Sequence, residues 1–175
     1  MRLLGADGVA VPREDYERCR GQVVIHCAAV VPKSDEEADN GDAAAISLTL
    51  VERLLVCEPR FLVFVSTRAE GSAYAAGKRY AEDRCFHSGI PTCVIRLPGL
   101  YGPPKERGLV WTAARAILAG QSFTPQNKIP DWYSVMPVEE AAQLCVTFAR
   151  NDVPCPGPIK AFNGTIEAFL SWVRE

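Results

Sequence analysis

The stretch FLVFVSTRAEGSAYAAGKRYAEDR, residues 61–84, decides which fold the sequence predicts. Its first five residues are apolar and rich in aromatic and β-branched side chains, and the hydroxyl residues Ser66 and Thr67 follow them. This composition is typical of a strand buried in a sheet. Residues 68–73 contain the loop-forming pair Gly-Ser, and the pattern from Tyr74 onward is helical. We therefore expect a strand, a short loop and a helix.

The predicted helix carries Lys78 four positions after Tyr74, so both side chains lie on one helical face, one turn apart. A free phenol has a pKa of about 10, and a nearby ammonium group lowers that pKa. A hydroxyl at the end of the strand, Thr67 or Ser66, could hold a substrate oxygen while the tyrosine transfers a proton. These groups suit proton removal from an alcohol whose carbon loses a hydride. The alternative is a solvated Tyr–Lys pair, with the hydroxyls capping the loop backbone.

Outward from this stretch, strands and helices alternate along the chain. The expected elements are a helix at 13–20, strand 22–27, helix 43–57, strand 91–97, helix 108–120, strand 133–136, helix 138–150, strand 159–164 and helix 165–175. We expect loops at 31–42, 98–104 and 121–132. The alternation predicts an α/β fold with a mainly parallel sheet and helices on both faces. The length of 175 residues predicts a single domain, 1–175.

Two small residues, Ala28 and Ala29, follow the apolar strand at 22–27. Open α/β sheets bind ligands at the carboxyl ends of their strands, where small side chains let a ligand approach the backbone. Tight packing between the strand and the next element explains the alanines equally well, and both interpretations stay open.

Charge and composition exclude several classes of function. The net charge is −2 and the chain has no run of basic residues, which argues against nucleic acid or an anionic membrane surface as a partner. No apolar run approaches the ~20 residues of a membrane span. The N-terminus lacks a basic region followed by an apolar core, so we expect no signal peptide and a cytoplasmic protein.

The seven cysteines contain no C-x-x-C pair, and the chain has only two histidines. This pattern does not predict a metal site. We expect free, largely buried thiols in a reducing compartment, with Cys27, Cys93 and Cys145 inside apolar stretches. A G-x-S-x-G turn does not occur, which excludes an α/β-hydrolase site.

Four segments occur in an order that matches a known family: VIHCAA (24–29), FLVFVST (61–67), YAAGK (74–78) and IRLPGLYGP (95–103). Together they resemble the extended short-chain dehydrogenase/reductase family, of the NAD-dependent epimerase/dehydratase type, over residues 23–142. The resemblance implies a Rossmann-like fold. It also implies an NAD- or NADP-dependent reaction at a hydroxyl or carbonyl carbon of a nucleotide-sugar or similar small molecule.

The resemblance also assigns roles. It makes Tyr74 the general acid/base and Lys78 the group that lowers its pKa and binds the nicotinamide ribose. The strand-end hydroxyl would be Thr67, with Ser66 as the adjacent candidate. The cofactor-binding positions that it implies are Cys27, Ala28, Ala29, Lys78, Pro98, Gly99 and Leu100. A homodimer through two helices, one of them the tyrosine-bearing helix, is a further expectation.

The chain departs from the family pattern in two places. It contains no G-x-x-G-x-x-G turn, and VIHCAA matches the fourth strand of the family, so we expect an N-terminally truncated Rossmann-like domain in which residues 150–175 are a remnant of the substrate-binding part. The loop between Thr67 and Tyr74 is much shorter than in the family. The alternative function is a non-catalytic Rossmann-derived interaction or regulatory module, or an inactive fragment.

Overall fold

The computed structural model describes residues 8–29, 35–103, 109–121, 134–160 and 164–165. The chain divides into two compact units. The first unit comprises Met1–Arg96 and Gln143–Lys160, and the second comprises Leu97–Ala142 and Ala161–Glu175.

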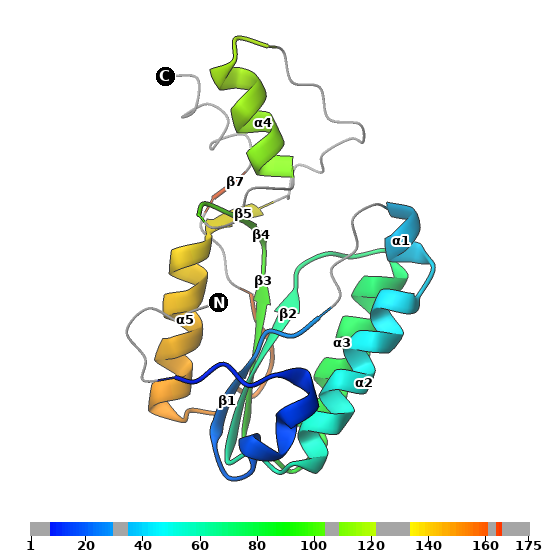
Figure 1. Cartoon of the computed structure of the whole chain (residues 1–175), viewed down its shortest axis with the longest axis vertical. Coiled ribbons are helices and arrows are strands. Elements are labelled where there is room, and N and C mark those ends of the chain that lie inside the picture. Colours follow the sequence, from blue (N-terminus) through cyan, green and yellow to red (C-terminus); the bar gives the residue numbers. More distant parts are fainter. Residues whose placement is uncertain (1–7, 30–34, 104–108, 122–133, 161–163, 166–175) are drawn as a thin grey trace. The chain divides into compact units, whose positions relative to one another are not determined.

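A four-stranded sheet in the order β1-β2-β3-β6 forms the centre of the first unit (Figure 1). Its strands are β1 (Val23–His26), β2 (Phe61–Thr67), β3 (Thr92–Leu97) and β6 (Ile159–Lys160). The pairs β1–β2 and β3–β6 are parallel. Because consecutive strands of a parallel sheet must be joined by crossovers, the sheet is flanked by helices.

The helices of the first unit cover both faces of this sheet. They are the 3₁₀ helix η1 (Arg13–Cys19), α1 (Asp35–Asp39), α2 (Asp42–Val56), α3 (Ala73–Phe86) and the part of α5 (Val138–Asn151) that follows residue 142. Figure 1 shows α2 and α3 on one side of the sheet and α5 on the other. The predicted Rossmann-like arrangement, mainly parallel with helices on both faces, is confirmed.

Strand β2 lies at the centre of the hydrophobic core of the first unit, because its side chains are buried on both faces of the sheet. Residues 61–64 are at most 1% exposed. Leu62 and Phe64 pack against the apolar stripe of α2, which contributes Leu50, Val51 and Leu54. Burial on both faces explains why residues 61–65 form a continuous apolar run rather than an alternating one.

The close packing of α2 and α3 depends on Gly77, which lies in the middle of α3. A Cβ atom at position 77 would overlap the Cβ of Ala44 on α2 and come within 3.0 Å of its Cα. The glycine of YAAGK thus has a structural role, since it lets two helices approach more closely than any side chain would allow.

Replacing Gly77 by alanine should lower the free energy of unfolding by about 1–2 kcal/mol. The overlap involves the backbone of Ala44 as well as its Cβ, so we expect a cost of about 2–3 kcal/mol, of which the better helix propensity of alanine returns about 1 kcal/mol. Urea denaturation measures the loss. The double variant Gly77→Ala/Ala44→Gly should recover part of it, because the overlapping Cβ is removed. A Gly77→Ala variant as stable as the wild type would contradict this packing of α2 against α3.

The second unit contains a separate three-stranded sheet in the order β4-β5-β7. Its elements are β4 (Gly99–Tyr101), α4 (Leu109–Leu118), β5 (Ser134–Pro137), the start of α5, and β7 (Gly164–Thr165). Strand β4 pairs parallel with β5, and β5 pairs antiparallel with β7. Among the described helices of both units, none has the length and apolar character that a membrane crossing requires.

Three sequence predictions about elements are wrong. Residues 35–39, expected in a loop, form helix α1, and residues 99–101, expected to be irregular, form strand β4. The single strand expected at 159–164 is instead β6 and β7, which belong to different sheets. In the two strand cases the pairing partner is distant in the sequence, so local composition carried no signal. Of the helix expected at 165–175, Thr165 lies in β7, and residues 166–175 lie outside the described residues. Residues 122–132 of the loop expected at 121–132 also lie outside them.

Candidate active site

Helix α3 carries the two central candidates, and its start is fixed by a cap. The hydroxyl oxygen of Ser72 accepts a hydrogen bond from the backbone N–H of Ala75 at 3.2 Å. Gly71, at φ +78°, turns the chain immediately before the cap. This start places Tyr74 in the first turn of the helix and Lys78 one turn later.

Lys78 is buried, with only 4% of its surface exposed. Its Nζ donates to the carbonyl oxygen of Val65 at 2.8 Å and lies 4.7 Å from the ring centroid of Phe64. Burial lowers the pKa of Lys78 to about 8, although nearby Cys27, Cys85 and Glu82 act to raise it. Among the described residues, Nζ donates a hydrogen bond only to the carbonyl oxygen of Val65. An ammonium group has three N–H donors, so the others remain available for a ligand oxygen.

Tyr74 is half-buried, and burial raises its pKa above the ordinary value of 10. The predicted lowering of this pKa by Lys78 is therefore wrong for this structure. The physical reason is that the ammonium of Lys78 points to β2, where it binds Val65. At neutral pH the phenol is fully protonated, and in that form Tyr74 can donate a proton.

The two strand-end hydroxyls are each engaged locally. Ser66 is buried and donates to the carboxylate of Glu82. The hydroxyl oxygen of Thr67 accepts a hydrogen bond from the backbone N–H of Ala69 at 3.0 Å. This contact matches the alternative from the sequence, in which the hydroxyls cap the loop backbone. Successive side chains of a strand point to opposite faces of the sheet. Ser66 and Thr67 therefore cannot serve one substrate atom together, and the hydroxyl proton of Ser66 is already bound.

The carboxylate of Glu82 is the centre of a buried network of hydrogen bonds and ion pairs, which the sequence did not predict. This residue is 2% exposed. Nε of Arg96 lies 3.0 Å from both carboxylate oxygens, Nη2 of Arg96 lies 2.5 Å from Oε2, and Nη1 of Arg79 lies 2.8 Å from Oε1. Burial acts to raise the pKa of Glu82, but hydrogen bonds from Arg96 and Ser66 and the nearby positive charges outweigh it, so the pKa is lowered.

The network also fixes the loop between β2 and α3. Arg79 donates to the carbonyl oxygens of Thr67 at 2.7 Å and Ala69 at 3.2 Å. A sequence signal existed, because Glu82 is four residues after Lys78 and shares the face of Tyr74 and Lys78. A carboxylate on the buried face of a helix needs a positively charged or hydrogen-bonding partner, because an unpaired buried charge is costly. In this chain that partner is Arg96 of β3.

At the end of β1, His26 is 3% exposed and stacks on Phe64, with ring centroids 5.9 Å apart and planes at 16°. The edge of Tyr16 meets the same imidazole at 6.2 Å. Burial, followed by the charges of Lys78 and Arg13, lowers the pKa of His26 to about 4. The carboxyl ends of β1 and β2 thus bring His26, Phe64 and Lys78 into one cluster.

The predicted cofactor positions that follow β1 lie near this cluster. Cys27 is exposed, so the expectation that it is buried is wrong, whereas Cys93 and Cys145 are buried as expected. Cys27 lies close enough to Lys78 to affect the pKa of the lysine. Ala28 and Ala29 are half-buried, and Ala28 packs against the core of α2 and β2.

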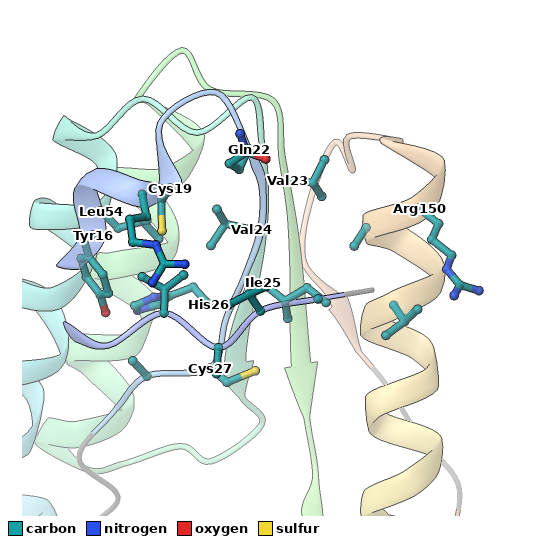
Figure 2. A pocket seen from close by; sticks show the side chains of 18 residues that line it. Tyr16, Cys19, Gln22, Val23, Val24, Ile25, His26, Cys27, Leu54 and Arg150 are labelled. Carbon is teal, nitrogen blue, oxygen red and sulfur yellow. The ribbon is translucent and has the colours of Figure 1, made fainter. Parts of the chain in front are cut away.

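A cavity of about 730 Å³ runs along β1 (Figure 2). Its lining includes His26, Cys27 and Ala28, together with Tyr16 of η1 and Arg150 of α5. Tyr74 and Lys78 do not line it. Because His26 both lines the cavity and stacks on Phe64, its ring connects the cavity with the cluster at the ends of β1 and β2.

Pro98, Gly99 and Leu100 belong to the second unit. All three are half-buried. Gly99 and Leu100 pair with Val135 and Met136 of β5. Their expected place on the nicotinamide side remains a prediction.

The comparison with protein families decides the identity of the fold. Residues 14–160 match the model of the "NAD dependent epimerase/dehydratase family". The chain belongs to this family.

Solved structures similar to this epimerase/dehydratase family member support the same fold. A UDP-N-acetylglucosamine 4-epimerase from Bacillus cereus has a TM-score of 0.72 at 14% identity, with 93% of this chain and 65% of that chain covered. The enzyme of the same name from Methanobrevibacter ruminantium M1, in complex with UDP-N-acetylmuramic acid, has a TM-score of 0.72 at 18% identity, with 98% and 63% covered. DesIV, a dTDP-glucose 4,6-dehydratase from Streptomyces venezuelae with NAD and TYD bound, has a TM-score of 0.67 at 16% identity, with 90% and 58% covered.

The chain thus spans less than two thirds of the length of each of these three structures. At identities below 25%, the likeness shows the fold alone. The comparison with curated proteins gives no match.

The described residues of this family member fit a dinucleotide. A buried ammonium with unused donors, Lys78, lies near the carboxyl ends of parallel strands, next to the exposed Cys27 and the small residues after it. This is the place where open α/β sheets bind ligands. A metal is a poorer fit, because the described residues contain no group of three His, Cys, Asp or Glu side chains that could hold one.

The low pKa of His26 predicts a loss of stability in acid for this family member. The unfolded chain binds a proton near pH 6.5, whereas the folded chain resists it until about pH 4. The stability that neutral His26 contributes to the folded chain is therefore fully present above pH 6.5 and is lost as the pH falls toward 4. The difference amounts to about 3 kcal/mol. Replacing His26 by phenylalanine should remove this pH dependence, and the variant keeps an aromatic ring against Phe64.

The measurement is the free energy of unfolding of both proteins between pH 8 and pH 4. Since acidic residues such as Glu82 contribute to both proteins, the informative quantity is the difference between wild type and His26→Phe. We expect the difference to change by about 3 kcal/mol in favour of the variant as the pH falls. Parallel pH curves would show that His26 titrates normally in the folded chain.

Proposed function

We propose that the chain is part of an NAD(P)-dependent epimerase/dehydratase-type short-chain dehydrogenase/reductase that acts on a hydroxyl or carbonyl carbon of a nucleotide-sugar or similar small molecule. The observation that carries the proposal is the buried Lys78, one turn after Tyr74, at the carboxyl ends of two parallel strands. Family membership and the nucleotide-sugar enzymes among the similar structures support it.

Each residue then has a role that follows from its surroundings. NAD or NADP would supply the hydride acceptor and donor. Lys78 would bind hydroxyl oxygens of the cofactor with the N–H donors that Val65 does not use. Tyr74, whose pKa is raised, would donate its phenolic proton to a substrate oxygen and take it back in the reverse direction. Thr67 is the better hydroxyl candidate, because Ser66 is bound to Glu82.

The remaining partner proposals follow from the same family. The substrate is a small molecule, and neither nucleic acid nor a membrane is proposed as a partner. A homodimer through α2 and α3 is supported by Ile46 and Tyr80, which are large side chains left exposed on these two helices. The cytoplasm is the proposed location, consistent with seven free cysteines.

The second candidate is a non-catalytic Rossmann-derived interaction or regulatory module. It is favoured by the engaged state of both strand-end hydroxyls and by the raised pKa of Tyr74. These features would leave the scaffold intact but the proton transfer unassisted.

Incubation of the chain with NAD⁺ and UDP-N-acetylglucosamine or dTDP-glucose distinguishes the two candidates. Products are separated by anion-exchange chromatography and identified by NMR. The enzyme proposal predicts a C4 epimer or a 4-keto product that depends on added NAD⁺. No conversion of either nucleotide-sugar, together with no binding of NAD⁺ or NADP⁺, would favour the non-catalytic module.

A further inference from the structure

The sulfur atoms of Cys93 and Cys155 lie 2.7 Å apart, although the two residues are 62 positions apart in the sequence. Cys93 is buried near the start of β3. Cys155 is half-buried in the loop before β6. The backbone holds the two together, because the N–H of Cys155 donates to the carbonyl oxygen of Thr92 at 3.1 Å. A disulfide bond is about 2.05 Å long, so the sulfurs need to move by less than about 1 Å to form one.

We propose that Cys93 and Cys155 are a redox-sensitive pair that forms a disulfide by exchange with a low-molecular-weight disulfide such as oxidised glutathione. This modification site is separate from the proposed dehydrogenase/reductase chemistry. It would fasten the loop that leads into β6 onto β3, next to the parallel pairing of Ile95 with Ile159.

The accessibility of the two thiols sets the order of the exchange. Cys155, the more accessible, attacks as a thiolate one sulfur of oxidised glutathione, the glutathione S–S bond breaks, and one glutathione thiolate leaves. Cys93 then loses its proton and attacks the sulfur of Cys155, the mixed disulfide breaks, and a second glutathione thiolate leaves. Two protein thiols are oxidised and one oxidised glutathione is reduced to two thiols. Burial raises the pKa of Cys93, and so the second step is the slower one.

Peptide mapping tests the pair directly. The purified chain is equilibrated in buffers of oxidised and reduced glutathione, alkylated, and digested with trypsin without reduction. Cys93 lies in the tryptic peptide 85–96 and Cys155 in the peptide 151–160. Because the first peptide also contains Cys85, the variant Cys85→Ala is the matched control.

We expect the linked peptide in the wild type and in Cys85→Ala, at least about tenfold above Cys155→Ser or Cys93→Ala, and a melting temperature raised by about 5–15 °C on oxidation. Cys155→Ser changes a half-buried loop residue, so this comparison holds even if Cys93→Ala fails to fold. If Cys155 remains a mixed disulfide with glutathione, or if Cys85→Ala abolishes the linked peptide, the proposed pair is wrong.

Discussion

Replacing Tyr74 by phenylalanine is expected to lower kcat of the proposed reaction by about 10²–10⁴-fold, the range that a single acid/base group contributes. The substitution removes one oxygen atom from a half-buried ring in the first turn of α3 and leaves the helix cap at Ser72 intact. Because the phenolic proton moves only in the transition state, KM should change little.

The matched control for this prediction is Tyr80→Phe. Tyr80 lies on the same helix but is 55% exposed, and we expect its loss of the hydroxyl to leave kcat unchanged. The readout is the rate of nucleotide-sugar conversion, with circular dichroism to confirm that both variants fold. A Tyr74→Phe variant that keeps more than about a tenth of the wild-type kcat would remove Tyr74 from the chemistry.

Replacing Glu82 by glutamine should lower the free energy of unfolding by about 3 kcal/mol, more than the loss expected for Gly77→Ala. Breaking a buried ion pair costs about 3–5 kcal/mol, because the partner charge is left uncompensated. We expect the lower end of that range because the side chains of Arg79 and Arg96 are 28% and 21% exposed and can reach solvent. Urea denaturation at pH 7 measures the loss.

The matched control is Glu52→Gln, which breaks the exposed ion pair with Arg84 on the neighbouring helices. Exposed pairs contribute little, so this variant should lose only a small fraction of the Glu82 effect. The lowered pKa of Glu82 adds a test of sign: its contribution is present above the ordinary carboxyl pKa and is lost as the pH falls. If Glu82→Gln is as mild as Glu52→Gln, the buried network contributes little to stability.

The sequence predicted the parts of the fold that depend on local patterns. The strand expected at 61–67 is observed at Phe61–Thr67, and the helix expected from Tyr74 begins at Ala73. The strand followed from its run of aromatic and β-branched residues, and the helix followed from the helical pattern after the Gly-Ser loop. The parallel α/β arrangement followed from the alternation of these elements.

The features that the sequence did not predict depend on partners far away in the chain. Ser66 was the alternative to Thr67 as the hydroxyl that faces the substrate, yet Glu82, 16 residues later, binds its hydroxyl. Lys78 was expected to act on Tyr74, but the carbonyl of Val65 holds it. Residue spacing places side chains on one face of a helix, and only the packed strand decides which atoms they reach.

The most direct measurement of the central claim is a titration of the chain with NADH, followed by nicotinamide fluorescence, for the wild type and Lys78→Met. We predict saturable binding at pH 7 that weakens above pH 8, where the buried ammonium loses its proton, and that falls at least about tenfold in Lys78→Met. Since removing a buried charge relieves desolvation, the variant should remain folded, so its loss of binding is interpretable. No binding of NADH or NADPH at millimolar concentration, or equal binding by both proteins, would contradict the proposed dinucleotide site.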